Sequence, residues 1–173
     1  MHETPEQYKA RMLNLTEGKD VVAVHRETAS KLAKLVDGKS SAQLSKRPAA
    51  DKWSVSEILV HLAEAEVSCF WRYRQMIEHN GSTIVPFDQD LWYQLGEYES
   101  RDPHEALQLF RLMRDANLRM FDRLTPEQWQ RGGVHSERGP MTVADLARQM
   151  AGHDINHVAQ VEKILVEENK ASA

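Results

Sequence analysis

Cysteine is almost absent from this chain of 173 residues, since Cys69 is the only one. A single thiol excludes an internal disulfide and the cysteine spacings of zinc fingers. Long hydrophobic runs are missing as well. The N-terminal residues lack the apolar core of a secretory signal, and no stretch approaches the roughly 18 apolar residues of a membrane span. We therefore expect a cytoplasmic protein without a membrane partner.

The chain also lacks an excess of positive charge, because 22 basic residues stand against 26 acidic ones, for a net charge of −4. This balance argues against a nucleic-acid surface and against a basic patch for membranes. No glycine-rich phosphate loop is present. A small-molecule substrate is therefore the expected partner. The arginines occur in scattered pairs whose spacing suits solvated helix faces: Arg72 and Arg74, Arg111 and Arg114, and Arg119 and Arg123.

Apolar residues recur at helical spacing along most of the chain, whereas sustained strand-like alternation is absent. Several starts carry a capping residue, such as Thr4 before Pro5, and Ser54 with Glu57 three residues later. The pattern predicts helices over 4–15, 21–35, 54–79, 102–121 and 142–167, a helical turn at 125–127, and loops over 45–48, 80–98 and 132–140. We therefore predict an all-α fold, a four-helix bundle with an additional short N-terminal helix, as a single domain over 1–173.

Three histidines carry the candidate chemistry. His153 and His157 are four residues apart, about one helical turn, so both project from one face of the last helix. His61 lies among apolar residues of another predicted helix. Together the three imidazoles could hold one divalent ion and leave a position open for water or substrate, which is how catalytic metal sites are built.

A purely structural role for these histidines is the alternative. A buried imidazole without a partner costs on the order of 1–3 kcal/mol, and backbone or carboxylate partners could meet that cost as well as a shared ion. His25 also lies on an apolar stripe, where a satisfied core histidine is favoured over a fourth ligand. His135 lies in a loop, where we favour an anchoring or pocket role over metal binding.

Other polar residues near the histidines have two readings each. Glu64, one turn after His61, is a candidate proton shuttle or an acceptor for an imidazole N–H, and equally a surface carboxylate. Gln160, close to one turn beyond His157, is a candidate for orienting water. Asp154 could support an imidazole or be solvated. Cys69 is about 12 Å along the helix from His61, too far to share its ion, so a core role is expected.

The long connection over 83–98 carries several aromatic residues. Long ordered connections in compact domains are often functional. We therefore assign Phe87 and Trp92 to the wall of a binding pocket.

Three stretches resemble a known family. They are KWSVSEILVHLAEAE, FWRYRQMIEHNGSTIVPFDQDLW and HSERGPMTVADLARQMAGHDINHVAQVEKI, and the likeness spans about residues 48–164. In combination they are similar to the DinB/YfiT-like metalloenzymes, most of all to the branch that contains bacillithiol S-transferases.

The resemblance implies a four-helix bundle with unusual connectivity and often a homodimer. It also implies one divalent ion, nickel or zinc, on the three histidines that match His61, His153 and His157. Relatives include enzymes that use low-molecular-weight thiols and others described as metal-dependent hydrolases. Relatives in this branch often carry histidine where this chain has Asn156, so we expect a different pocket polarity or choice of thiol here.

Our leading hypothesis is a metal-dependent thiol S-transferase, which conjugates a low-molecular-weight thiol to small electrophiles, because a coordinated thiol readily loses its proton. The alternative is hydrolysis by a metal-bound hydroxide, with Glu64 or Asp154 moving protons. A non-catalytic metal-binding stress protein is the third reading. All-imidazole ligation suits several metals, so the sequence does not choose among them.

Overall fold

The computed structural model describes residues 4–171, in which eight helices and three short strands follow one another along the chain. The helices are α1 (Pro5–Leu15), α2 (Val21–Val36), α3 (Ser41–Leu44), α4 (Val55–Glu78), α5 (Gln89–Leu95), α6 (Pro103–Phe121), α7 (Pro126–Trp129) and α8 (Val143–Ala171). The strands are β1 (Ser82–Ile84), β2 (Gly132–His135) and β3 (Gly139–Thr142).

The long helices begin where the capping residues predicted. The Thr4 side chain caps α1 and closes a capping box with Gln7. At α4, the Ser54 hydroxyl accepts from the Glu57 N–H at 3.2 Å, and the Glu57 carboxylate accepts from the Ser54 N–H at 2.7 Å. These local bonds satisfy N–H groups that would otherwise lack partners, which is why the helix starts could be read from the sequence.

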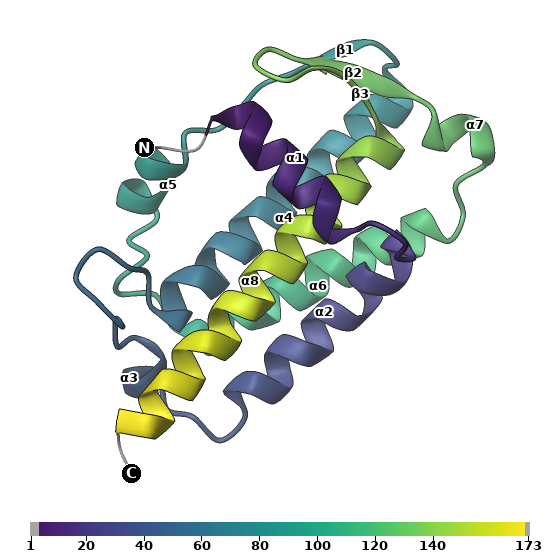
Figure 1. Cartoon of the computed structure of the whole chain (residues 1–173). Helices are drawn as coiled ribbons and strands as arrows, with labels where there is room; N and C mark the ends of the chain where they lie inside the picture. Colours follow the sequence, from purple (N-terminus) through teal and green to yellow (C-terminus); the bar gives the residue numbers. More distant parts are fainter. Residues whose placement is uncertain (1–3, 172–173) are drawn as a thin grey trace.

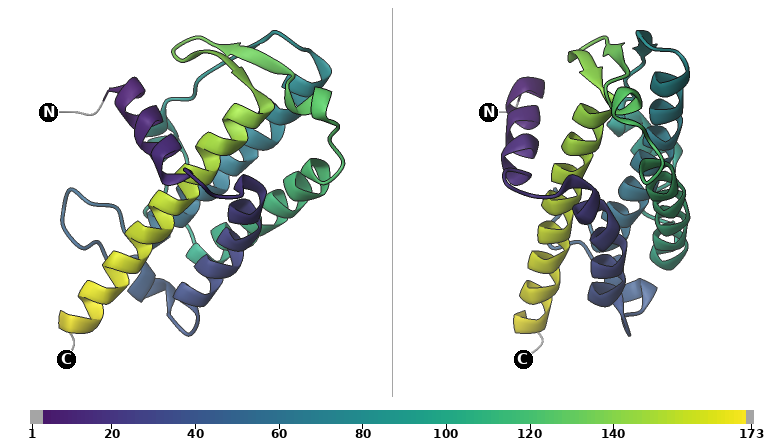
Figure 2. Two further views of the ribbon diagram at one scale, coloured as in Figure 1. Left: turned by 45° about the vertical axis from the view of Figure 1, so that its right-hand side comes forward. Right: turned by 90° about the vertical axis from the view of Figure 1, so that its right-hand side faces the viewer.

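Four helices, α2, α4, α6 and α8, form the predicted bundle (Figure 1). Their apolar stripes meet in a core that includes Leu32, Ile58, Phe110 and Val161, each at most 1 % exposed. Figure 2 shows α1 lying across the outside of α8, on the side away from α6. No helix within residues 4–171 is long and apolar enough to cross a membrane.

A small three-stranded sheet caps one end of the bundle (Figure 1), and the sequence did not predict it. Strand β1 pairs parallel to β2, with Thr83 opposite Val134, and β2 pairs antiparallel to β3, with His135 opposite Gly139. The expectation of plain loops over 80–98 and 132–140 was therefore wrong. Strands of three and four residues are too short to show an alternating pattern. The β2–β3 hairpin leads directly into α8, and its first strand contacts α4.

One of the arginines expected on solvated helix faces, Arg114, is buried, and Arg72 and Arg74 are only partly exposed. Arg114 is 1 % exposed and bonds to both oxygens of Glu66 at 3.0 and 2.9 Å. It also bonds to Asp154, at 2.5 and 3.1 Å, and donates to the backbone oxygen of His25 at 3.0 Å. Burial opposes ionisation of Asp154, but Arg114 outweighs it and holds the pKa of that carboxyl below its usual value. Arg72 lines a cavity described below.

Helix α1 packs against α8 at unusually close range. A Cβ atom placed on Gly152 would lie 2.0 Å from the backbone oxygen of Met12 and 2.7 Å from its carbonyl carbon. Only glycine, which has no side chain, allows this approach. The glycine at position 152 therefore sets how closely the backbone of α1 approaches that of α8.

The change Gly152→Ala tests this contact. Alanine normally stabilises a helix interior by about 1 kcal/mol relative to glycine. Here the new methyl group would meet backbone that cannot rotate away, so we expect a net loss of about 1–3 kcal/mol in the free energy of unfolding. Denaturant unfolding measures it. The control is Ala159→Gly, at an exposed position of the same helix, which measures only the difference in helix propensity between alanine and glycine. A stabilised Gly152→Ala protein would contradict the close approach.

Candidate metal centre

Three histidines from two helices converge inside the bundle. Helix α4 supplies His61, and α8 supplies His153 and His157. One ring nitrogen from each lies within 4.8 Å of the other two, and Nε2 of His61 is 2.9 Å from Nε2 of His153. The three side chains are only 3, 6 and 9 % exposed. Among the described residues, these three histidines are the one group of three or more histidine, cysteine or acidic side chains that lie close enough together to bind a single metal ion.

All three imidazoles are neutral near pH 7. Burial lowers the pKa of His61 to about 3, with a smaller effect from His157. Burial also lowers the pKa of His157 to about 4 and moves that of His153 well below its usual value. A neutral imidazole keeps a lone pair on one nitrogen, and that lone pair is what a metal ion binds.

Gln160 orients one of these rings. Its Oε1 lies 3.0 Å from Nδ1 of His157, so Nδ1 carries the proton and donates it. The lone pair of His157 is then on Nε2. A hydrogen bond of this kind to the far nitrogen is usual for metal-binding histidines. The sequence analysis assigned Gln160 to orienting water, whereas its observed partner is the imidazole of His157.

The donor set fits a divalent ion. Two ligand nitrogens on one tetrahedral zinc, each about 2.1 Å from it, are about 3.4 Å apart, so the histidine cluster has the scale of a one-ion site. Nδ1 of His153 is buried without a hydrogen-bond partner, and it is Nε2 of this ring that faces Nε2 of His61. Two neutral rings that meet in this way can share only one proton, whereas an ion between them would be bound by the lone pairs of both nitrogens.

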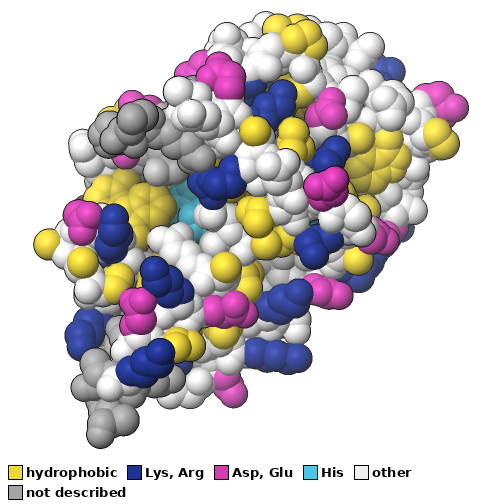
Figure 3. All heavy atoms as spheres, in the orientation of Figure 1, with side chains coloured by type: hydrophobic (Ala, Val, Ile, Leu, Met, Phe, Trp, Pro, Cys, Tyr) yellow, Lys and Arg dark blue, Asp and Glu magenta, His cyan; other side chains and the backbone are white. Residues whose placement is uncertain are grey.

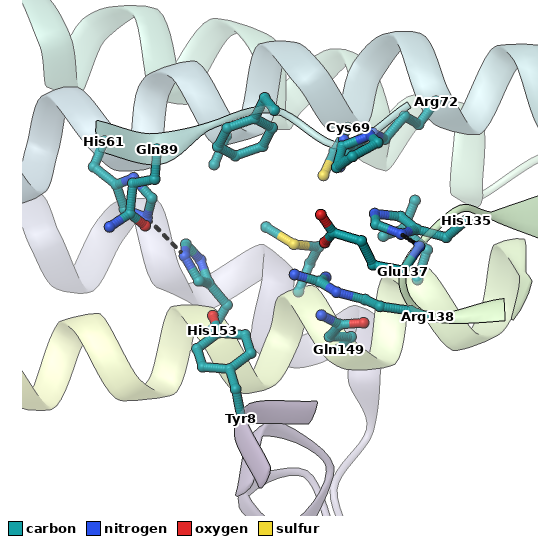
Figure 4. A pocket seen from close by; sticks show the side chains of 15 residues that line it. Tyr8, His61, Cys69, Arg72, Gln89, His135, Glu137, Arg138, Gln149 and His153 are labelled. Carbon is teal, nitrogen blue, oxygen red and sulfur yellow. Dashed lines mark hydrogen bonds between the residues drawn. The ribbon is translucent and has the colours of Figure 1, made fainter. Parts of the chain in front are cut away.

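A cavity of about 250 Å³ opens beside His61 and His153, between α4 and α8 (Figure 4). In the space-filling view, histidine surface shows between an apolar patch and a basic side chain (Figure 3). The cavity is lined by α1, α4, the segment before α5 and its first residue, the β2–β3 hairpin and α8: Tyr8; His61, Ala65, Cys69 and Arg72; Pro86, Phe87 and Gln89; His135, Glu137 and Arg138; and Leu146, Gln149, Met150 and His153.

The two aromatic residues assigned to the pocket take different places. Phe87 lines the cavity, while Trp92 stacks on Phe87 with 4.4 Å between ring centroids and is not part of the lining. A second tryptophan lies closer to the histidines. The Trp53 ring centroid is 5.2 Å from that of His61, and Trp53 stacks on Tyr93 at 5.9 Å, so it packs against the His61 ring.

Glu64 is turned toward the segment after α5. Its carboxylate accepts from the Tyr98 hydroxyl at 2.7 Å and lies 3.5 Å from Arg101, and it does not line the cavity. Asp154 is fully buried on Arg114, so the solvated reading of this residue was wrong. The imidazole nearest to Asp154 is that of His25, whose Nδ1 is 3.5 Å from its carboxylate.

His25 and His135 lie outside the histidine cluster. His25 is a core histidine whose Nε2 lies 2.9 Å from the backbone oxygen of Ala147. His135 both lines the cavity and anchors the hairpin turn, since its Nδ1 accepts from the N–H of Glu137 at 3.3 Å. Asn156 accepts from Arg11 on α1 at 2.7 Å and therefore faces that helix.

Cys69 is 2 % exposed yet contributes to the cavity lining. Burial raises the pKa of its thiol to about 12, so the sulfur stays protonated. It lies outside the histidine cluster, as its distance along α4 predicted.

Several lining residues escaped the sequence analysis, although their spacing was readable. Arg72 lies eleven residues after His61, three helical turns along one face of α4. Gln149 lies four residues before His153 on α8. Arg138 could not be found in this way, because its place depends on a hairpin that the sequence did not reveal.

Comparison with known proteins gives consistent results. A chain from Bacillus subtilis (strain 168) named "Putative metal-dependent hydrolase YfiT" is 24 % identical over 160 residues, or 91 % of this chain and 90 % of the relative. "Putative metal-dependent hydrolase OB0413" from Oceanobacillus iheyensis is 24 % identical over 144 residues, covering 83 % and 82 % of the two chains.

The solved structure of YfiT from Bacillus subtilis is described as a probable metal-dependent hydrolase with an unusual four-helix bundle topology. It superposes with a TM-score of 0.79 at 20 % identity, over 96 % of this chain and 90 % of that one, which establishes the shared fold. The sequence profile of the DinB superfamily matches residues 25–161, which include all three clustered histidines. The chain therefore belongs to the DinB superfamily.

Proposed function

We propose that this protein is a metal-dependent hydrolase of small molecules, with His61, His153 and His157 as the ligands of one divalent ion. The observation that carries the proposal is a buried set of three neutral imidazoles that opens onto a cavity. Relatives along most of the chain are named as metal-dependent hydrolases, which supports the same reading. A bound divalent ion would supply Lewis acidity and an activated water near pH 7.

The protein's own residues then have separate tasks. Gln160 holds His157 in the tautomer that leaves Nε2 free, and Trp53 packs against His61. Phe87 supplies an apolar wall for a substrate. Glu137 is the carboxylate in the cavity lining, and we therefore assign proton transfer to Glu137 in place of Glu64, whose partners lie elsewhere.

Thiol transfer is the second candidate. The sequence motifs support it, and the open histidine set suits a thiolate as well as a water molecule. Cys69 cannot supply that thiolate, because its thiol is buried with a pKa of about 12. A transfer reaction would therefore need a free low-molecular-weight thiol. The choice of nickel or zinc, the homodimer and the cytoplasmic location stay predictions.

The metal content of the purified, untagged protein tests the ligand set. We expect about one divalent ion per chain, lost in His61→Ala, His153→Ala and His157→Ala. Gln160→Leu should keep the ion but bind it roughly 10- to 100-fold more weakly, because the far nitrogen of His157 loses its partner. His104→Ala, at an exposed histidine of α6, is the matched control. Full metal content in the three alanine variants would refute the assignment.

The pH dependence of stability tests the burial of neutral histidines. Their pKa values are lower in the folded chain than in the unfolded one, so the unfolded state binds more protons between about pH 4 and 6.5. The free energy of unfolding of the metal-free protein should therefore rise with pH through this window and level off above it. Each histidine contributes up to about 1.4 kcal/mol per pH unit.

Denaturant unfolding at several pH values measures this slope. His157→Gln removes one of the titrating groups, so its slope should be smaller than that of the parent by about one proton. Equal slopes in the two proteins would show that His157 titrates normally in the folded state.

Hydrolysis and thiol transfer are separated by turnover of small aryl esters and amides with the metal-loaded protein. The proposal predicts release of acid and alcohol or amine without added thiol, falling to background in His153→Ala. The matched control is His104→Ala, which should retain the parent rate. Turnover that requires an added thiol and consumes it would instead establish the transferase, and metal binding without either reaction would support a non-catalytic protein.

A further inference from the structure

Two arginines face the cavity, and its described lining holds one carboxylate, that of Glu137. Arg72 from α4 and Arg138 from the β2–β3 turn both line it, at the end away from His61 and His153 (Figure 4). Arg72 donates to the backbone oxygen of Val85 at 2.7 Å, and Arg138 lies 6.0 Å from the centre of the Tyr8 ring. Within residues 4–171, neither guanidinium forms an ion pair with an acidic side chain.

The charge of Arg138 disfavours the charged form of Arg72. Burial lowers the pKa of Arg72, and the nearby Arg138 lowers it further. Burial and then the same two arginines lower the pKa of His135, which keeps its imidazole neutral between them. Glu137 is the single acidic residue among the described residues of the lining, so one carboxylate stands there against two guanidiniums. A group of opposite charge placed here would relieve this repulsion.

Hydrogen-bonding capacity is also left over at this end of the cavity. Nε of Arg138 is buried without a partner, and so is Oε1 of Gln149, a residue that is only 3 % exposed. Buried polar atoms are nearly always paired in folded proteins, so an unpaired donor and an unpaired acceptor that border one cavity point to a ligand that carries both kinds of group.

We propose that Arg72 and Arg138 form an anion subsite that binds a carboxylate or phosphate group of the substrate. The arginine fork suits either anion, because its N–H groups match two oxygens at once. The substrate would then be a small anionic molecule, bound by its charge at one end of the cavity and exposing its reactive bond to the histidines at the other. This inference rests on the proposed function for the identity of the reacting end, but the subsite itself does not require it.

Anion binding to the metal-free protein tests the subsite apart from any chemistry. Calorimetric titration with inorganic phosphate and with succinate reports the dissociation constant of each anion, and the tighter one identifies the preferred group. We expect Arg72→Gln and Arg138→Gln each to weaken binding at least about tenfold, as for a lost charge-assisted hydrogen bond, and the double variant to abolish it. Arg111→Gln, which removes the same charge from an exposed position on α6, should bind like the parent.

Two results would overturn the subsite: no binding of either anion to the parent, or unchanged binding in the double variant. Arg72→Gln also loses a bond to the backbone of Val85, so circular dichroism must show that it is folded. If Arg72→Gln is not folded, Arg138→Gln alone tests the subsite, because among the described residues the Arg138 side chain forms no hydrogen bond to a backbone atom.

A matched pair of ester substrates, one with a distal carboxylate and one with a neutral amide in its place, separates this inference from the proposed function. The subsite predicts a higher kcat/KM for the anionic ester, a preference that disappears in Arg138→Gln through a raised KM. Hydrolysis of both esters without such a preference would sink the subsite and leave the hydrolase standing. Anion binding that depends on both arginines, with neither ester hydrolysed, would support the subsite and contradict the hydrolase.

Discussion

The rest of this structure depends on the hydrogen bonds and ion pairs of one buried side chain, that of Arg114. It bonds to Glu66 of α4, Asp154 of α8 and the backbone oxygen of His25 in α2, so one side chain of α6 joins all four helices of the bundle. Removing one partner from such a buried cluster typically costs roughly 3–5 kcal/mol. Asp154 directly follows His153 in α8, so the cluster also fixes how α8 presents its histidines to α4.

The candidate metal centre follows from this arrangement, because helices locked in register can keep three polar rings in an apolar interior. Burial makes the imidazoles neutral, which prepares them as ligands, and it makes their lone pairs costly to leave unsatisfied. The adjoining cavity differs in character, since its far end holds two arginines that form no ion pair with an acidic side chain of residues 4–171. One site thus combines a neutral donor set with a positive wall, and the two ends suit different parts of one small molecule.

The sequence predicted the parts of the fold that depend on local bonds. Capping residues such as Ser54, and apolar stripes of helical period, located the long helices to within a few residues. The same reasoning missed the sheet, because its strands have only three or four residues and because β1 pairs with β2 about fifty positions away. It also misplaced Arg114. An arginine on a helix resembles a solvated residue until its carboxylate partners from two other helices are known.

By itself, the sequence determined that His153 and His157 share one helical face, since the period of the α-helix requires it at this spacing. Only the tertiary structure decided that His61, 92 residues from His153, meets that pair. Only the tertiary structure also brought Arg138 beside Arg72 and turned Glu64 away from the cavity. Helix geometry is set by bonds between residues close in the chain, whereas the packing of helices and the hairpin depends on the whole core at once.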